Sequence, residues 1–232
     1  MNLRFGGIVH GDEERWPGHA SSVLYLAGCP FRCPWCNTPS LVQTEGFAEQ
    51  SVEYFLNELS KSEAVVLTGG EPLMQGNAVL GLLQRLDAPV RIETNGYYSE
   101  TLNDCLPLAK EVQLDLKARL DARTYAEATA FRGDPELLLS NVLRSLTFLE
   151  KNGSRVRKVF SFTVVPGVND SPETARELAK YVSLYCDEFV LRSFDPSDCL
   201  DASFKERPAP ASDKMTELLK EVQGRVRKAV VL

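Results

Sequence analysis

The chain has 232 residues, of which 44% are hydrophobic and 25% are charged, and its formal net charge is −6. These values are typical of a globular protein and fit one α/β barrel domain, which we expect to span residues 1–232. The negative charge disfavours a general nucleic-acid binder, no apolar run is long enough to cross a membrane, and the first residues do not resemble a targeting peptide, so we expect a cytoplasmic protein.

Short apolar or β-branched runs alternate with helical patterns along the whole chain. Strands are expected at 22–27, 64–68, 90–94, 112–116, 159–165 and 189–192. Helices are expected after a cap at Ser51, from Pro135 through Leu149 with an end at Gly153, after Ser171-Pro172, and from Ser212 to Gly224. Six βα units with near-continuous apolar strands predict a parallel sheet in a partial (β/α)6 TIM-like barrel, with its chemistry at the carboxyl ends of the strands.

Three cysteines follow the first of these strands with the spacing C-x3-C-x2-C, at Cys29, Cys33 and Cys36. A short loop of this kind can supply three thiolates to an iron–sulfur cube and leave its fourth iron open for another ligand. Zinc with a distant fourth ligand, or a group of buried reduced thiols, would also fit the spacing. Three further cysteines are isolated in the sequence: Cys105, Cys186 and Cys199. They are expected to be buried apolar side chains, and a position near the site is left open for Cys199.

Polar or glycine-rich segments follow the next four strands, at the same predicted end of the sheet. They are Gly69-Gly70-Glu71-Pro72, Thr94-Asn95-Gly96, Asp115-Leu116-Lys117 and Val164-Val165-Pro166-Gly167. The paired glycines can bring backbone carbonyls close to a ligand, and the carboxylate after them can receive an ammonium group, although a plain glycine turn has the same sequence. Asp115 and Lys117 should share one face of a strand, either facing a ligand or forming a simple salt bridge.

The cysteine loop, with an aromatic residue just before its last cysteine, resembles the signature of the radical S-adenosylmethionine (SAM) superfamily. This resemblance implies a 4Fe-4S cluster on Cys29, Cys33 and Cys36, with SAM chelating the open iron. It further implies contacts from Gly69, Gly70 and Glu71 to the methionine amino group, and from Thr94 and Asn95 to the ribose or carboxylate. Lys117, near Asp115, would meet the methionine carboxylate, Trp35 would lie against the adenine or the cluster, and Val165 would lie by the adenine. Whether Glu93 and Asp115 bind a cation is left open.

Within the superfamily the chain resembles glycyl-radical-enzyme activating proteins over nearly its whole length, and most of all those of anaerobic ribonucleotide reductase. This implies a protein substrate, whose glycine loses a hydrogen to a 5′-deoxyadenosyl radical, and reduced ferredoxin or flavodoxin as electron donor. The alternative is a small-molecule enzyme such as 7-carboxy-7-deazaguanine synthase, which shares the cysteine loop and a Glu-Thr-Asn-Gly stretch; Asn37-Thr38 matches half of its Asp-Thr pair. A third alternative is a non-catalytic zinc or electron-transfer module. It is disfavoured because it does not account for the segments Gly69–Pro72 and Asp115–Lys117.

Overall fold

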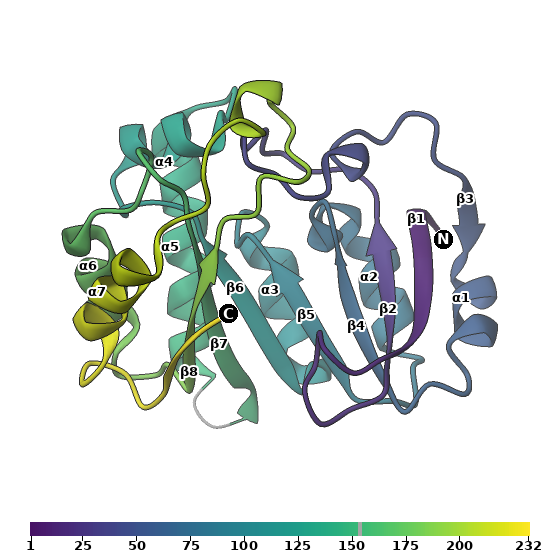
Figure 1. Ribbon diagram of the computed structural model, residues 1–232. Coiled ribbons are helices and arrows are strands. Elements are labelled where there is room, and N and C mark those ends of the chain that lie inside the picture. Colours follow the sequence, from purple (N-terminus) through teal and green to yellow (C-terminus); the bar gives the residue numbers. More distant parts are fainter. Residues whose placement is uncertain (153–154) are drawn as a thin grey trace.

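The computed structural model describes residues 1–152 and 155–232, which form one nine-stranded sheet with helices packed against it (Figure 1). The strands are β1 (Asn2–Asp12), β2 (Ser21–Leu26), β3 (Glu49–Ser51), β4 (Ala64–Gly69), β5 (Val90–Thr94), β6 (Glu111–Leu116), β7 (Arg157–Val164), β8 (Glu188–Ser193) and β9 (Ala229–Val231). The helices are α1 (Val52–Glu58), α2 (Gly76–Leu83), α3 (Ser99–Cys105), α4 (Ala122–Thr129), α5 (Pro135–Lys151), α6 (Pro172–Val182) and α7 (Ser212–Val222).

The order of the strands in the sheet is β3-β1-β2-β4-β5-β6-β7-β8-β9. All six strands predicted from the sequence are present, as β2 and β4 to β8, and each pairs in parallel with the next. Strands β1 and β3 extend the sheet antiparallel at one edge, and β9 extends it in parallel at the other. The sheet is open, because the edge strands β3 and β9 are not neighbours, which agrees with a partial barrel.

One face of the sheet carries the apolar core. Leu67, Ile92, Leu114 and Phe162 are fully buried in one cluster with apolar side chains of the covering helices. The helices that pack on this face include α2, α3 and α5, which lie behind the strands in Figure 1. The burial of these side chains from water is the main force that holds helices and sheet together.

The opposite face is more polar than the sequence analysis predicted. The expectation of near-continuous apolar strands is wrong for β5 and β6, where Arg91 and Glu93, and then Glu111, Gln113 and Asp115, alternate with apolar residues. These side chains point away from the helices, since successive residues of a strand face opposite sides. They form the wall of a polar lumen inside the partial barrel.

Helices begin at the residues that the sequence predicted. The hydroxyl oxygens of Ser51 and Ser171 accept hydrogen bonds from the first turns of α1 and α6, and the Asp134 carboxylate does the same for α5. Helix α7 begins at Ser212 as expected, although no side chain caps it. The predicted end of α5 at Gly153 lies outside the described residues. Among the described helices, none combines the length and the apolar composition that a membrane span requires.

Replacing Phe162 by alanine should lower the free energy of unfolding by about 3–5 kcal/mol, because the side chain is fully buried between sheet and helices and its loss leaves a cavity. Denaturant titration of wild type and variant measures this. Leu184, which is 85% exposed, provides the control. A Leu184→Ala loss as large as that of Phe162→Ala would contradict the assignment of the core.

Candidate functional site

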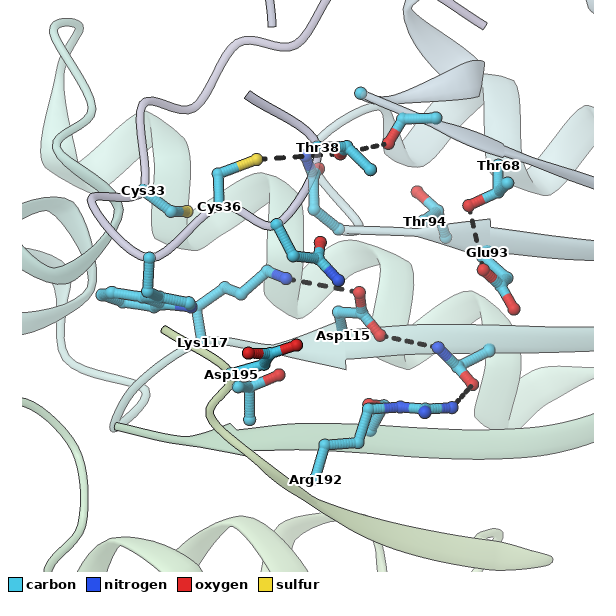
Figure 2. A pocket seen from close by; sticks show the side chains of 18 of the residues that line it. Cys33, Cys36, Thr38, Thr68, Glu93, Thr94, Asp115, Lys117, Arg192 and Asp195 are labelled. Atoms are coloured by element: carbon cyan, nitrogen blue, oxygen red, sulfur yellow. Dashed lines mark hydrogen bonds and ion pairs between the residues drawn. The ribbon is translucent and has the colours of Figure 1, made fainter. Parts of the chain in front are cut away.

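The carboxyl ends of the parallel strands surround one pocket of about 480 Å³. Ten of the residues predicted for the site line it: Cys29, Cys33, Trp35, Cys36, Gly69, Gly70, Thr94, Asn95, Asp115 and Lys117. Figure 2 shows Cys33 and Cys36 on one side of the pocket, Thr68, Thr94 and Glu93 on the opposite side, and Lys117 and Asp115 below the cysteines. Two predicted residues, Glu71 and Val165, are fully buried and do not line the pocket.

The cysteine loop is held in place by its backbone. Gly28, at the end of β2, has a φ of +98°, a left-handed conformation that favours glycine. Its N–H donates to the Leu41 carbonyl at 2.7 Å, and the Cys29 N–H donates to the Val42 carbonyl at 3.0 Å. The turn from Cys33 to Cys36 is closed by a third backbone hydrogen bond of 3.0 Å. The loop is therefore anchored at its start and closed by a turn in its second half, which holds the backbone that carries the thiols.

The three thiols are free and suit a metal that stabilises thiolates. Burial raises the pKa of Cys33 to about 12 and, together with the nearby Cys33 and Glu71 groups, also raises the pKa of Cys29. Thiols in such surroundings ionise only if a strong positive charge binds them. The Asn95 amide donates to Cys29 Sγ at 3.6 Å, and the Thr38 hydroxyl oxygen lies 3.8 Å from Cys36 Sγ. This donor set fits an iron–sulfur cluster, whose sulfurs commonly accept hydrogen bonds.

In the described residues no group of three or more His, Cys, Asp or Glu side chains is gathered closely enough to hold a single metal ion. The three thiols of the cysteine loop do not form such a group either.

Gly69 and Gly70 bring the end of β4 into direct contact with the end of β2. A Cβ atom on Gly69 would lie 2.1 Å from the Leu26 carbonyl oxygen, and one on Gly70 would lie 2.4 Å from the Gly28 carbonyl oxygen. The Gly70 N–H donates to Leu26 at 2.9 Å, and the following N–H, of Glu71, donates to Gly28 at 2.7 Å. The two glycines are needed because no side chain fits between these two backbones.

The Glu71 carboxylate faces the protein rather than the pocket. One oxygen accepts hydrogen bonds from the Leu73 N–H at 3.0 Å and the Thr94 hydroxyl at 2.8 Å, and the other accepts one from the Asn95 N–H at 2.7 Å. Burial raises the pKa of Glu71 to about 7, although these donors act in the opposite direction. The carboxylate is oriented toward these donors, and its predicted contact with an ammonium group stays a prediction. Its visible role is to join the loop after β4 to the loop after β5.

Val165, like Glu71, lies behind the lining of the pocket. Its side chain is fully buried in a cluster with the cysteine loop, and its N–H donates to the Asn169 amide oxygen at 2.8 Å. The predicted contact of Val165 with adenine stays a prediction.

Asp115 and Lys117 form an ion pair of 3.3 Å on the pocket wall (Figure 2). The Gln113 amide donates to the other Asp115 oxygen at 2.9 Å. Burial would lower the pKa of Lys117, but the neighbouring Asp115 and Cys33 groups outweigh it and raise the pKa. Lys117 therefore presents a permanent positive charge beside the cysteine loop.

Glu93 is paired with protein cations in the structure. It accepts from Arg15 at 2.5 Å and from the Thr68 hydroxyl at 2.9 Å, and Arg91 lies 3.2 Å from its other oxygen. Arg15 was not predicted for the site, because it lies in the loop between β1 and β2, ahead of the first predicted strand. The alternation of polar residues in β5 and β6 was the available signal for Arg91 and Gln113.

The loop that follows β8 covers the cysteine loop from outside. The Asp201 N–H donates to the Pro34 carbonyl at 3.0 Å, and the ring of Trp35 lies 6.4 Å from that of Phe204. Cys199, in the same loop, is buried in one cluster with Trp35. Cys105 and Cys186 are buried in the main core, as expected.

Comparison with known proteins agrees with this site. The model of the Radical SAM superfamily matches residues 23–179. The chain belongs to the radical SAM superfamily. It is an enzyme of this kind, and the superfamily works with SAM and an iron–sulfur cluster.

The resemblance to glycyl-radical-enzyme activating proteins is confirmed as well. The chain is 30% identical, over its whole length and 96% of the relative's, to the "Putative glycyl-radical enzyme activating enzyme" of Methanocaldococcus jannaschii. It is 28% identical to the pyruvate formate-lyase 2-activating enzyme of Escherichia coli, over 82% of this chain and 80% of the relative. The 7-carboxy-7-deazaguanine synthase of Hyperthermus butylicus is 37% identical, but over 36% of this chain and 38% of that protein.

Solved structures support the fold. A radical SAM methyltransferase from Sphaerobacter thermophilus aligns with 94% of this chain and 67% of its own, with a TM-score of 0.65 and 16% identity. QueE from Escherichia coli aligns with the whole of this chain and 94% of its own, with a TM-score of 0.62 and 16% identity.

Gly70→Ala should displace the cysteine loop, because the new Cβ would contact the Gly28 carbonyl oxygen at 2.4 Å. We expect the free energy of unfolding to fall by about 1–3 kcal/mol, and iron bound after anaerobic reconstitution to fall with it. Gly7→Ala is the control, since nothing lies within 4 Å of a Cβ there. Equal iron content in both variants would contradict this account of the glycine pair.

Glu71→Gln should change how stability depends on pH. Because the pKa of Glu71 is raised to about 7, the folded protein holds this proton more tightly than the unfolded chain, so wild-type stability should fall as pH rises from about 4.5 through about 7. Glutamine cannot lose a proton, and the variant should gain on the order of 3 kcal/mol relative to wild type across that window. Unfolding titrations at pH 5 and pH 8 measure the change. The exposed Glu13→Gln should show no such trend, and a constant difference for Glu71→Gln would refute the prediction.

Proposed function

We propose that this enzyme uses a 4Fe-4S cluster on Cys29, Cys33 and Cys36 to activate a partner enzyme by removing a hydrogen from one of its glycines. The observation that carries the proposal is the full-length similarity to a glycyl-radical enzyme activating enzyme. Three free thiols on one anchored loop, beside a pocket lined by strand ends, support the same proposal. The partner we propose is an anaerobic ribonucleotide reductase, with reduced ferredoxin or flavodoxin as electron donor and the cytoplasm as the site of action.

The bound cluster and SAM would supply the electron and the 5′-deoxyadenosyl radical. Of the chain's own residues, the backbone of Gly69 and Gly70 would bind the methionine amino group, and Lys117, held by Asp115 at 3.3 Å, its carboxylate. Thr94 and Asn95, which donate to Glu71 from a hydroxyl and a backbone N–H, would contact the remainder of the cofactor, with Trp35 and Val165 near the adenine.

The walls of the pocket would exclude water from the reaction. A reactive radical needs shielding from water and from stray hydrogen donors. The loop after β8 closes over the cysteine loop through Asp201 and Phe204, and the loop between β1 and β2 reaches into the lumen through Arg15. We propose that the whole chain, residues 1–232, forms one radical SAM domain around this pocket, with no role in binding nucleic acids or membranes.

A second candidate function is the synthesis of a small molecule by the same radical chemistry, as in the 7-carboxy-7-deazaguanine synthases. Partial similarity to several proteins of that name supports it. The position of Thr38 also favours it, because the hydroxyl lines the pocket 3.8 Å from Cys36 Sγ and 3.4 Å from the Gly69 carbonyl oxygen. In those synthases the corresponding threonine is expected near a magnesium ion.

The test is release of 5′-deoxyadenosine by the anaerobically reconstituted, reduced enzyme with two candidate substrates. One reaction contains an anaerobic ribonucleotide reductase from the same genome, and the other contains 6-carboxytetrahydropterin. The proposal predicts stimulation by the reductase together with a glycyl radical signal in its electron paramagnetic resonance spectrum. Stimulation by the pterin alone would favour the second candidate.

Cysteine variants serve as controls for the same assay. Cys33→Ala should abolish release with either substrate, since it removes a cluster ligand. Cys105→Ala removes a thiol that is buried in the main core, outside the pocket, and should retain iron, sulfide and activity. A purified protein with zinc and no labile sulfide would refute both radical functions.

A further inference from the structure

The cations of the lumen differ in whether a carboxylate neutralises them. Arg15 pairs with Glu93 at 2.5 Å, and Lys117 pairs with Asp115 at 3.3 Å. Arg91, deeper in the lumen, lies between Glu93 and Glu111. Each of these positive charges therefore has an anionic partner supplied by a neighbouring side chain.

Arg192, on β8, is different. It lines the pocket and donates from Nε to the Ser161 hydroxyl at 3.2 Å and from Nη2 to the Gln113 amide oxygen at 3.4 Å. Both acceptors are neutral. Within residues 1–152 and 155–232, no carboxylate, that of Leu232 included, lies within the ion-pair limit of 4.0 Å from its guanidinium.

The position of this guanidinium is fixed by its neighbours. The Gln113 oxygen also accepts from Arg91 at 2.5 Å, and its amide group donates to Asp115 at 2.9 Å, so the orientation of Gln113 is determined from both ends. Figure 2 shows this line of contacts from Lys117 through Asp115 to Arg192. Gln113 and Ser161 are both buried, which limits the water available to Arg192 on that side. Arg192 is thus a partly buried cation in a fixed position with no carboxylate partner among the described residues, and it is oriented to bind an anion.

We propose that Arg192, with the hydroxyl groups of Ser161 and Thr163, forms a subsite for a carboxylate group of the substrate. Both hydroxyl residues lie on β7 and line the pocket beside Arg192, and Thr163 is its partner in the sheet register. Arginine and hydroxyl donors match a carboxylate in geometry. A doubly charged phosphate would fit less well, because Asp12, Glu14 and Asp195 also line the pocket.

The subsite lies beside the residues assigned to the cofactor. Most of those residues lie at the ends of β2, β4, β5 and β6, with Val165 after β7, whereas Arg192 belongs to β8 and Ser161 to β7, where Ser161 pairs in register with Asp115. The source of the carboxylate rests on the proposed function: it is then an acidic side chain beside the target glycine of the partner enzyme. If the substrate is a small molecule instead, the same subsite binds a carboxylate of that molecule.

The test is a comparison of matched probes on the anaerobic holoenzyme with SAM bound. One pair is acetyl-Gly-Glu-amide and acetyl-Gly-Gln-amide, and the other is glutarate and glutaramide. Dissociation constants are measured for wild type, for Arg192→Gln and for Arg85→Gln, an exposed arginine paired with Glu53 outside the pocket. We expect the charged probe of the peptide pair to bind wild type and Arg85→Gln about tenfold more tightly than its amide, and Arg192→Gln to lose this preference.

The outcomes separate the subsite from the proposed function. Equal affinity for charged and neutral probes in wild type, including no binding of either, would overturn the subsite, as would a preference that survives in Arg192→Gln. A preference confined to glutarate would support the subsite and assign it to a small acid, against a protein substrate. Failure of the reductase to be activated while the peptide preference persists would refute the proposed function alone.

Discussion

The site depends on the direct contact between the ends of β2 and β4. The backbone of Gly69 and Gly70 lies so close to Leu26 and Gly28 that neither glycine could carry a Cβ atom. The Glu71 carboxylate then extends this contact to β5, through the Thr94 hydroxyl and the Asn95 N–H. Three strand ends are thereby joined by hydrogen bonds within a buried region, where such bonds are strong and an unpaired group would be costly. The cysteine loop follows β2, so these contacts also determine its position.

Much of the fold was predictable because its signals are local. Apolar runs marked β2 and β4 to β8, and capping residues such as Ser51, Asp134 and Ser171 marked helix starts. Strands β3 and β9 have three residues each, too few for a periodic pattern. The clustering of the ten pocket residues could be predicted because parallel strands bring their carboxyl ends to one edge of the sheet, whereas their selection as site residues came from the resemblance to the radical SAM superfamily.

The orientation of side chains was less predictable, since it depends on contacts between distant parts of the chain. Glu71 was expected to face a ligand, yet Thr94 and Asn95, 23 and 24 residues further along, turn its carboxylate inward. Arg15 reaches Glu93 across 78 positions. No local pattern encodes such a pair, because the approach of the β1–β2 loop to β5 is decided by the sheet as a whole.

The polar lumen follows from the openness of the barrel. In a closed barrel, inward side chains pack against one another and are mostly branched and apolar. Here the wall of β5 and β6 carries Arg91, Glu93, Glu111 and Gln113, all nearly excluded from solvent. Charged groups tolerate such burial only in paired and hydrogen-bonded form, so the network both fills the open barrel and fixes its geometry. Arg192, which is partly buried at the edge of this network and has no ionic partner among the residues that the structure describes, is therefore more informative than the paired charges around it.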